Sequence, residues 1–244
     1  MLANTHAIIL RTVPFGDTSL VVTAITKAFG LQSYLVKGAR STGKKGQTLR
    51  PYMQPGALLS LVVYRHPTEH LQYIREISWS TVYKRVLTNV VHHSVAIFMV
   101  ELLTKCLRQS EPNPDLFTEV ENYFLLLDSA EPVVVANLPL HFALFLAGEL
   151  GFRPENNFSP QNGSFDLGEG RFVPSSPHGK YLLEGDLARF THQLLSVAHP
   201  ITLYRVKLSR VHRQELLKAY ETYFGIHIDG FGHLRSLEVL MTLF

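Results

Sequence analysis

The sequence predicts an α+β chain of two domains, a small closed five-stranded barrel followed by an all-α helical domain with an irregular loop and hairpin insertion. Three observations support this fold class. Apolar residues in the first 78 positions form short β-branched runs between turn residues, a pattern typical of strands. After Trp79 the apolar residues recur every three or four positions, which is helical spacing. The segment 153–185 is rich in proline and glycine and interrupts the helices.

The first domain is expected over residues 1–78. Pro14, Gly16, Gly30 and Gly38 break its apolar runs. Five short strands with turns between them fit an oligonucleotide/oligosaccharide-binding (OB) barrel, and closure of the barrel removes exposed strand edges. The expected strands are residues 7–10, 20–26, 31–36, 57–64 and 70–77.

The helical domain is expected over residues 79–244. A long amphipathic helix is predicted from Trp79 to Leu103, and the Glu111–Pro114 segment ends it. The run 133–150 is apolar on all sides, so we expect it in the core, with Gly151 as its stop. In 153–185, residues 165–167 and 171–173 flank a glycine turn and predict a short hairpin. The remaining helices are expected at 115–127, 187–197, 209–224 and 234–243.

Composition excludes several protein classes. The chain has 244 residues, of which 46% are hydrophobic and 18% charged, so it is not a disordered chain. No apolar run reaches the roughly 18 residues that a membrane span requires, and Arg11, Pro14 and Asp17 interrupt any signal-peptide pattern. The single cysteine, Cys106, excludes an internal disulfide and a four-cysteine zinc site. A reducing cytoplasm is therefore the expected location.

Charge is distributed unevenly along the chain. Residues 1–80 hold nine Lys and Arg against three acids, whereas residues 81–244 hold fourteen against seventeen. No acid lies between Asp17 and Glu69. Such a basic module attracts a polyanion, usually nucleic acid. The cations of this stretch are Lys27, Lys37, Arg40, Lys44, Lys45, Arg50 and Arg65.

Aromatic residues are interleaved with these cations. Exposed rings on an OB barrel stack on unpaired bases, although many rings in a small barrel fill its core. On this basis Tyr34 and Tyr52 are candidate stacking residues. The interleaved rings are Phe15, Phe29, Tyr34, Tyr52 and Tyr64.

The sequence contains no motif that positively indicates an enzyme. Gly38 to Lys45 nearly spells a phosphate loop, but Lys45 stands where a Mg²⁺-binding hydroxyl is required. The same segment is compatible with a solvated loop or with a loop that grips a nucleic-acid backbone. His92 and His93 are adjacent on the predicted long helix and point to different faces, and the zinc-peptidase string H-E-x-x-H does not occur. Cys106 is read as a small core residue.

Several strings resemble the RecO family of bacterial DNA-repair and recombination mediators. The most specific is Lys37–Arg40, followed by Leu49–Pro51. The resemblance covers nearly the whole chain in order. The other similar strings are Ala7–Leu20, Thr26–Gly30, Leu150–Pro154 and Ser236–Leu240.

The resemblance implies a non-catalytic protein of the bacterial cytoplasm and nucleoid. It implies binding of single- and double-stranded DNA, annealing of complementary strands, and work with RecR and single-stranded-DNA-binding protein (SSB) so that RecA can load. By position, Lys37 and Arg40 are the best candidate DNA contacts. On charge, the further candidates are Lys44, Lys45, Arg50, Arg11 and Arg65, with Tyr34 as a candidate for stacking.

The sequence departs from the family in one respect. Many members carry a four-cysteine zinc finger after the Leu-Gly-Phe-Arg-Pro string, whereas residues 156–185 here contain no cysteine and only His178. A structural zinc site needs about four N/S ligands, so we predict no zinc and no other cofactor. The hairpin around Gly168 is expected to keep its shape without metal.

The helical domain is expected to bind proteins. The acidic tail of SSB ends in an aromatic residue, so its receptor needs an apolar notch beside Lys or Arg. The candidate rim residues are Lys105, Arg108, Arg205, Lys207, Arg210 and Arg213. Two other functions stay open at this point: an RNA-binding OB-fold protein and a non-catalytic protein-interaction scaffold.

Overall fold

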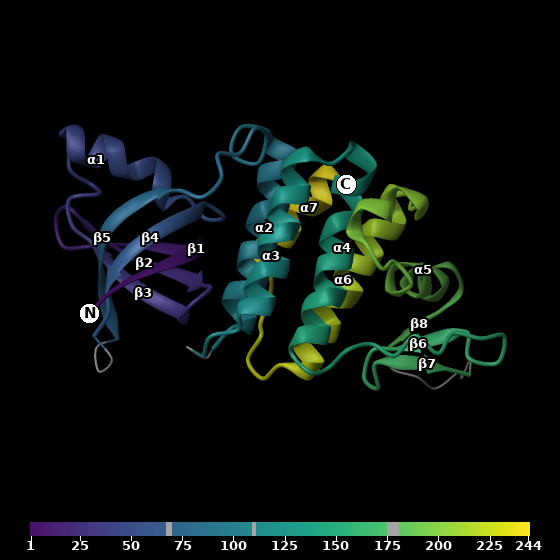
Figure 1. Cartoon of the computed structure of the whole chain (residues 1–244). Coiled ribbons are helices and arrows are strands. Elements are labelled where there is room, and N and C mark those ends of the chain that lie inside the picture. The colour runs from purple at the N-terminus through teal and green to yellow at the C-terminus, as the bar shows by residue number, and fades with distance from the viewer. Residues whose placement is uncertain (67–69, 109–110, 175–180) are drawn as a thin grey trace. The chain divides into compact units, whose positions relative to one another are not determined.

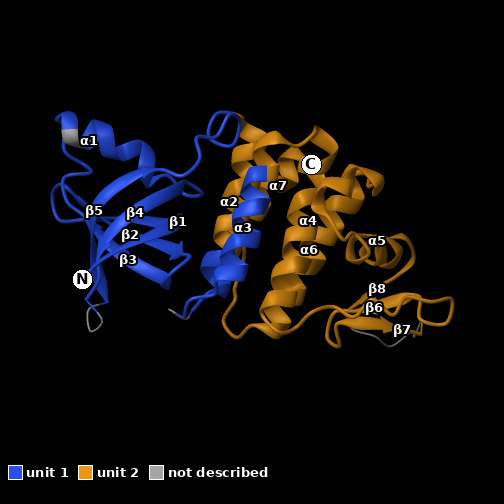
Figure 2. Ribbon diagram, viewed as in Figure 1, with its two compact units in different colours: residues 1–88, 103–125 blue, residues 89–102, 126–244 orange. Residues whose placement is uncertain are grey.

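The computed structural model describes residues 1–66, 70–108, 111–174 and 181–244. The chain divides into two compact units (Figure 2). Unit 1 comprises Met1–Thr88 and Leu103–Leu125, and unit 2 comprises Asn89–Leu102 and Leu126–Phe244. The division therefore falls within two helices, α2 (Val90–Cys106) and α3 (Pro114–Ser129).

The N-terminal part of unit 1 is a closed five-stranded barrel with the strand order β1-β2-β3-β5-β4 (Figure 1). All neighbouring strands pair antiparallel except β3 and β5, which close the barrel in parallel through three residue pairs. The predicted OB-type barrel is confirmed. Its strands are β1 (Leu2–Phe15), β2 (Ser19–Thr26), β3 (Gly30–Val36), β4 (Leu58–Tyr64) and β5 (Leu71–Trp79).

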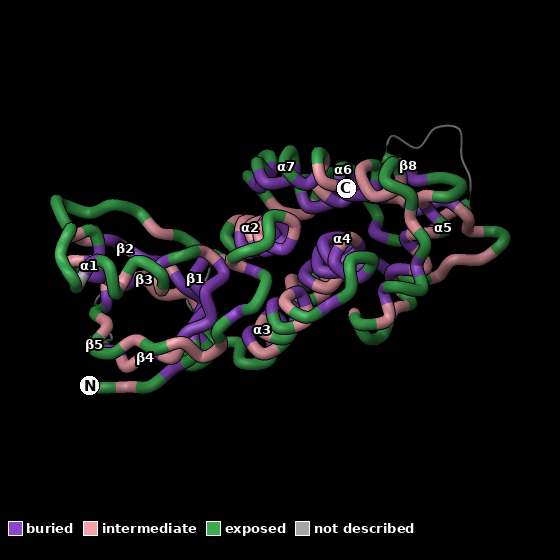
Figure 3. The backbone as a smooth tube through the Cα atoms, turned by 90° about the horizontal axis from the view of Figure 1, so that it is seen from above, coloured by how far each residue is buried: buried purple, intermediate pink, exposed green. Residues whose placement is uncertain are grey.

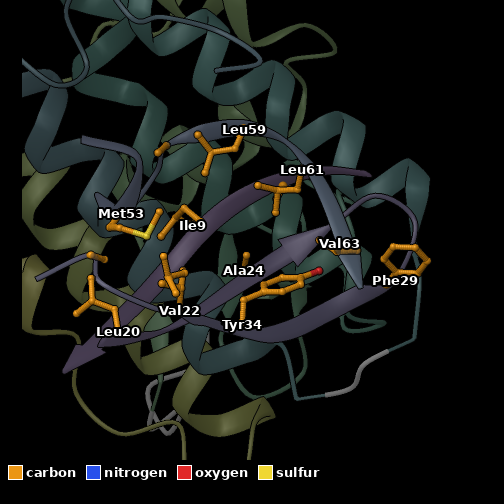
Figure 4. Packing of buried hydrophobic residues seen from close by; sticks show 14 residues of the cluster. Ile9, Leu20, Val22, Ala24, Phe29, Tyr34, Met53, Leu59, Leu61 and Val63 are labelled. Carbon is orange, nitrogen blue, oxygen red and sulfur yellow. The ribbon is translucent and has the colours of Figure 1, made fainter. Parts of the chain in front are cut away.

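Apolar side chains from alternate strand positions fill the barrel. The cluster includes Ile9, Val22, Tyr34 and Leu61, all almost fully buried (Figure 4). Between β3 and β4 the chain forms a short helix α1 (Lys44–Leu49) and a 3₁₀ turn η1 (Arg50–Met53). Met53 enters the same core from η1, so this connection is anchored to the barrel rather than hanging free.

The segment after the barrel differs from the sequence prediction. The long helix was expected to begin at Trp79, but Trp79 ends β5 and α2 begins only at Val90. The intervening Tyr83 is buried, and its hydroxyl donates to the Gly56 carbonyl at 2.8 Å. The buried Val86 thus reflects docking of a non-helical connection, which helical spacing alone does not distinguish, whereas Val82 is exposed.

Unit 2 is built mainly from helices. α4 (Pro132–Glu149) is buried over most of its length (Figure 3) and contacts η2 (Pro200–Arg205) and α6 (Arg210–His227). Its neighbours include α5 (Gly185–Leu195), while α7 (Arg235–Leu243) ends the chain. α4 is the one described helix long and apolar enough to cross a membrane, and 61% of it is buried, as in a core helix.

The irregular segment contains a small three-stranded sheet. β6 (Ser164–Asp166) pairs antiparallel with β7 (Arg171–Val173) and with β8 (Leu182–Leu183). The hairpin predicted around Gly168 is therefore confirmed. Gly170 has a φ of +66°, and a Cβ atom at this position would lie only 2.7 Å from the Tyr223 hydroxyl oxygen. Only glycine therefore fits there.

Candidate nucleic-acid interface and partner groove

A bulge in β1 creates the exposed face of the barrel. The β1–β2 register shifts between Ile9 and Arg11. Ile9 points into the core, and without the shift every second residue after it would do the same. Because of the bulge, Arg11, Val13 and Phe15 point outward instead and are all exposed. The sequence prediction did not include this bulge.

Neighbouring strands extend this outward face. The registers place Val13 opposite Val21, Val21 opposite Leu35, and Leu35 opposite Tyr73 of β5. These four side chains form an apolar row across four strands, and Tyr73 at its end is 37% exposed. We call this surface the β1–β2–β3–β5 face.

A second row holds charge. Phe15 pairs with Ser19, and the β2–β3 register continued by one residue beyond Leu20 and Val36 brings Lys37 opposite Ser19. The Lys37 ammonium lies 5.3 Å from the centre of the Tyr73 ring. A cation at this distance is attracted to the π-face. Lys37 therefore lies beside Tyr73, directly after the end of β3.

A groove opens where β3 and β5 diverge beyond Leu35 and Tyr73. Its volume is about 280 Å³, and it is lined by the end of β3, by Lys37 directly after β3, by Leu49 of α1, and by residues of β5 that include Tyr73 and Arg75. Arg75 sits at a register shift of the β4–β5 pair and forms a 3.3 Å ion pair with exposed Glu76. Tyr73 and Arg75 were missed by the sequence analysis because they lie outside the acid-free stretch. Only the register brings them beside Lys37.

The predicted loop cations gather at the same end of the barrel. Leu20 pairs with Val36, so the end of β3 lies beside the β1–β2 turn. Lys44 and Arg50 belong to α1 and η1, which follow β3 directly, and both are exposed. Lys45 belongs to α1, and its side chain lies outside the described part of the structure.

Arg40 has a structural contact as well as a charge. Its Nη1 donates to the Gly16 carbonyl at 3.1 Å, and its backbone N–H donates to the Thr18 carbonyl at 2.8 Å. Arg40 therefore ties the β3–α1 connection to the β1–β2 turn. Its guanidinium is exposed, so the remaining N–H groups stay accessible to an anion.

Two of the predicted contacts lie elsewhere. Arg65 follows β4, and its guanidinium lies 4.5 Å from the centre of the Phe29 ring, beside the turn between β2 and β3. Tyr34 is only 1% exposed, and burial raises its pKa to about 12. A ring inside the core has no face open to a base, so Tyr34 is corrected from a stacking residue to a core residue.

Tyr52 is also unsuited to stacking on a base. Its ring is half-buried and lies 4.8 Å from the Trp79 ring, against the barrel core. The aromatic residues left on the β1–β2–β3–β5 face are Phe15 and Tyr73.

The predicted cations are not neutralised by carboxylates. Among the residues that the structure describes, none of the side chains of Arg11, Lys37, Arg40, Lys44 and Arg50 has an acidic group within salt-bridge distance. In the described parts of the barrel, the acids are Asp17 and Glu76. The face and its adjoining loop therefore carry a net positive field.

Unit 2 contains an apolar groove beside two predicted rim residues. The groove has a volume of about 440 Å³ and lies between the start of α4, with Val133 and Ala136, and the segment 206–209. Lys207 and Arg213 line it, and burial lowers the pKa of Arg213. The Arg213 Nη1 donates to the Leu208 carbonyl at 2.8 Å. We call this site the α4–α6 groove.

Asn137 fixes one wall of this groove. It is fully buried on α4, and its Nδ2 donates to the carbonyls of Leu203 at 3.2 Å and Val206 at 2.9 Å. These bonds satisfy backbone acceptors that would otherwise be buried unpaired. They hold the 203–206 segment against α4 one helical turn from Val133.

The remaining rim candidates lie at other places. The Arg205 guanidinium lies 5.7 Å from the centre of the Tyr204 ring. Arg205 also lines a separate cavity of about 490 Å³ together with His192 and His199. Arg210 donates to the Met241 and Thr242 carbonyls at the end of α7. Lys105 and Arg108 belong to unit 1 rather than unit 2.

The hairpin segment does not offer the donors that structural zinc requires. In the described parts of the chain, no group of three His, Cys, Asp or Glu side chains comes together. His192 and His227 are engaged with the Asn156 side chain and the Leu167 carbonyl. His178 lies outside the described residues. The chain's residues therefore do not fit the metal that the family resemblance implies.

Ring packing and hydrogen bonds hold the described part of the hairpin together. Phe172 contacts both Phe158 and Phe165 edge-to-face, at 5.3 and 5.0 Å between ring centres. The Asn157 side chain forms two bonds with the backbone of Phe172, donating to its carbonyl and accepting from its N–H, at 2.9 and 2.8 Å. Three rings and one amide thus join β6, β7 and the preceding loop.

Comparison with known proteins covers the whole chain. A family model described as the N-terminal part of recombination protein O matches residues 1–83, and one described as its C-terminal part matches residues 87–238. The DNA repair protein RecO of Christiangramia forsetii is 30% identical over 244 residues, with all of both chains aligned. RecO proteins of Flavobacterium psychrophilum and Azobacteroides pseudotrichonymphae are 28% and 26% identical over the same length. With the barrel and the helical part in the same order, the chain belongs to the RecO family of DNA repair proteins.

Proposed function

We propose that this protein is a non-catalytic recombination mediator. It binds single- and double-stranded DNA, anneals complementary strands, and with RecR helps RecA load onto SSB-coated DNA. One observation carries the proposal: exposed cations without carboxylate partners in the described structure gather on one face and one end of an OB-type barrel. The central ones are Lys37, Arg40, Lys44 and Arg50.

Charge neutralisation supplies the annealing mechanism. Two DNA strands repel each other through their phosphates, and cations that bind phosphates release the condensed counterions. Lys37 and the α1 segment hold one strand by its phosphates, while the rest of the basic face accepts a second. The lowered repulsion lets complementary bases pair. No bond of the DNA is broken, so no general acid, base or nucleophile is needed.

The α4–α6 groove supports the proposed contact with SSB. An acidic tail with a terminal aromatic residue requires an apolar cavity for the ring and cations for the carboxylates. Val133 and Ala136 supply the apolar wall, and Lys207 and Arg213 supply the charge. Of the predicted rim residues, these two are therefore the proposed tail contacts.

Other parts of the proposal rest on the family. Work with RecR, an indirect effect on RecA and a place at the bacterial nucleoid in the cytoplasm follow from membership in the RecO family. We also propose that the protein holds no zinc, because its hairpin lacks the donors. A nucleic-acid-binding domain at 1–78 and a helical domain at 79–244 remain the proposed functional division.

Charge reversal of two barrel cations tests the proposal. The substitutions Lys37→Glu and Lys44→Glu leave the Arg40–Gly16 contact intact, whereas Arg40→Glu would also disturb the turn. We expect DNA affinity to fall at least about tenfold at 0.1 M salt, and the slope of log affinity against log salt to decrease by about one per lost phosphate contact. Fluorescence anisotropy with labelled single strands measures both.

Matched assays distinguish this function from its alternatives. Lys218→Glu reverses an exposed charge on α6 and is expected to leave DNA affinity unchanged. Annealing of SSB-coated strands, with and without RecR, tests the mediator role directly. Unchanged affinity in the Lys37/Lys44 variant contradicts the site. Tighter binding to RNA than to DNA of the same sequence contradicts DNA as the ligand.

A further inference from the structure

Two exposed aromatic residues on the barrel are not explained by charge. Phe15 at the end of β1 is 53% exposed, and Tyr73 on β5 is 37% exposed. Both belong to the β1–β2–β3–β5 face, where Val13, Val21 and Leu35 form an apolar row that reaches Tyr73 and continues to Tyr64 of β4. Large apolar side chains on a strand's outer face cost free energy in water unless a ligand covers them.

We propose that Phe15 and Tyr73 form a stacking site for unpaired nucleobases, so that this face selects single-stranded over duplex DNA. This inference rests on the proposed DNA-binding function and adds the ligand class of the face. Every base has a π-face that stacks on aromatic side chains whatever the sequence. In a duplex those π-faces are covered by the neighbouring base pairs, so a flat aromatic and apolar surface offers a duplex no comparable contact.

The turn that carries Phe15 is held in place from outside its own hairpin. Gly16 has a φ of +55°, which permits the tight turn after Phe15. The Arg40 side chain donates to the Gly16 carbonyl, and the Arg40 backbone N–H donates to the Thr18 carbonyl. Arg40 is thus a positioning residue for Phe15. A ring whose backbone is already ordered loses less entropy when a base binds.

Cations lie where the phosphates of a stacked strand require them. Lys37 stands in the row of Phe15 and approaches the Tyr73 ring at 5.3 Å, and Arg75 lines the same groove as Tyr73. Stacking and charge contribute to binding in different ways. The charge contribution depends on salt through counterion release, whereas the stacking contribution does not. The two can therefore be separated by experiment.

Single substitutions on the full-length protein test the site. Phe15→Ala and Tyr73→Ala remove the rings, Phe15→Leu keeps an apolar side chain without a ring, and Tyr204→Ala is the control. Tyr204 is 46% exposed but belongs to η2 of unit 2 rather than to the barrel. Affinities are measured by anisotropy for oligothymidine and for a duplex of equal length, over a range of salt concentrations. Thermal melting checks that each variant is folded.

The site predicts a specific pattern of losses. Phe15→Ala, Phe15→Leu and Tyr73→Ala should each weaken single-strand binding by about 5- to 140-fold, the range for one lost base stack. Duplex affinity and the salt slope should stay within about twofold of wild type, and Tyr204→Ala should match wild type on both ligands. These outcomes together support the stacking site.

Three outcomes overturn the inference. One is unchanged single-strand affinity in both ring variants. Another is an equal loss on single strands and duplex, and the third is an equal loss in Tyr204→Ala. If the wild-type protein binds neither DNA, the proposed function itself fails. That result differs from wild-type binding that is insensitive to the rings, in which only the stacking site fails.

Discussion

At the scale of single residues, His141 makes folding depend on pH. It is 9% exposed on α4, and its Nε2 lies 3.2 Å from the Val197 carbonyl. Burial lowers its pKa, and the bond to Val197 opposes this only in part. The folded state therefore holds His141 neutral, whereas the unfolded chain takes up a proton below the ordinary pKa of about 6.5. The stabilisation is complete above that pH and is lost as the pH falls.

We expect the free energy of unfolding to decrease from about pH 7.5 to about pH 5.5, and His141→Gln to reduce that decrease. Glutamine keeps an N–H donor without a titrating group. Urea unfolding monitored by circular dichroism at several pH values measures the effect. His199→Gln is the control, since His199 is exposed and the substitution should leave the slope unchanged. Identical pH slopes for wild type and His141→Gln would exclude His141 as the source.

Residue type predicted part of the candidate site. Lys37, Lys44 and Arg50 could be named from the acid-free stretch, because Lys and Arg rarely stay buried. Tyr34 could not be assigned correctly, since an aromatic residue in a small barrel serves either the core or the surface. The register decided between the two, and it also brought Tyr73 and Arg75 to Lys37. Arg65 has the same charge as Lys37, but its guanidinium lies over the Phe29 ring beside the turn between β2 and β3.

At the scale of elements, the spacing of apolar residues predicted which strands and helices form better than it predicted where their side chains point. All five strands and the hairpin at Gly168 follow from alternation and turn residues. The β1 bulge left no sequence signal, yet it turns Arg11, Val13 and Phe15 outward. The expected long helix was wrong at its start, because residues 80–89 dock without forming a helix. Tertiary contacts such as Tyr83 with Gly56 override local spacing there.

The hairpin of unit 2 is expected to be stable without metal. Asn157→Ala removes both side-chain bonds to Phe172, and each costs about 1 kcal/mol. We expect faster amide hydrogen exchange in β6 and β7 of this variant, while α4 and α6 stay protected. Adding a chelator to the wild-type protein should change neither the exchange nor the melting temperature.

An exposed amide elsewhere provides the control. Asn122→Ala replaces an exposed residue of α3 and should leave exchange in the hairpin unchanged. One equivalent of zinc per chain in elemental analysis, or faster hairpin exchange after chelation, would contradict a metal-free hairpin. Unchanged exchange in Asn157→Ala would show that the rings alone hold it.

At the scale of the whole molecule, the two proposed surfaces belong to different units. The β1–β2–β3–β5 face lies in unit 1, and the α4–α6 groove lies in unit 2. The first binds a polyanion over an extended area, whereas the second receives one short acidic and aromatic segment. A mediator on SSB-coated DNA needs both contacts, but annealing of bare strands needs only the first. Substitutions in the two units should therefore affect different reactions.

Charge reversal in the groove tests this separation. Lys207→Glu places a carboxylate beside the apolar wall at Val133, where it repels an acidic tail. We expect annealing of bare strands to match wild type, and annealing of SSB-coated strands to slow about tenfold, the effect of roughly 1.4 kcal/mol of lost affinity. The Lys37→Glu/Lys44→Glu variant should instead slow both reactions. If Lys207→Glu slows both equally, or if SSB tail peptide does not compete with SSB for the wild-type protein, the groove does not receive the tail.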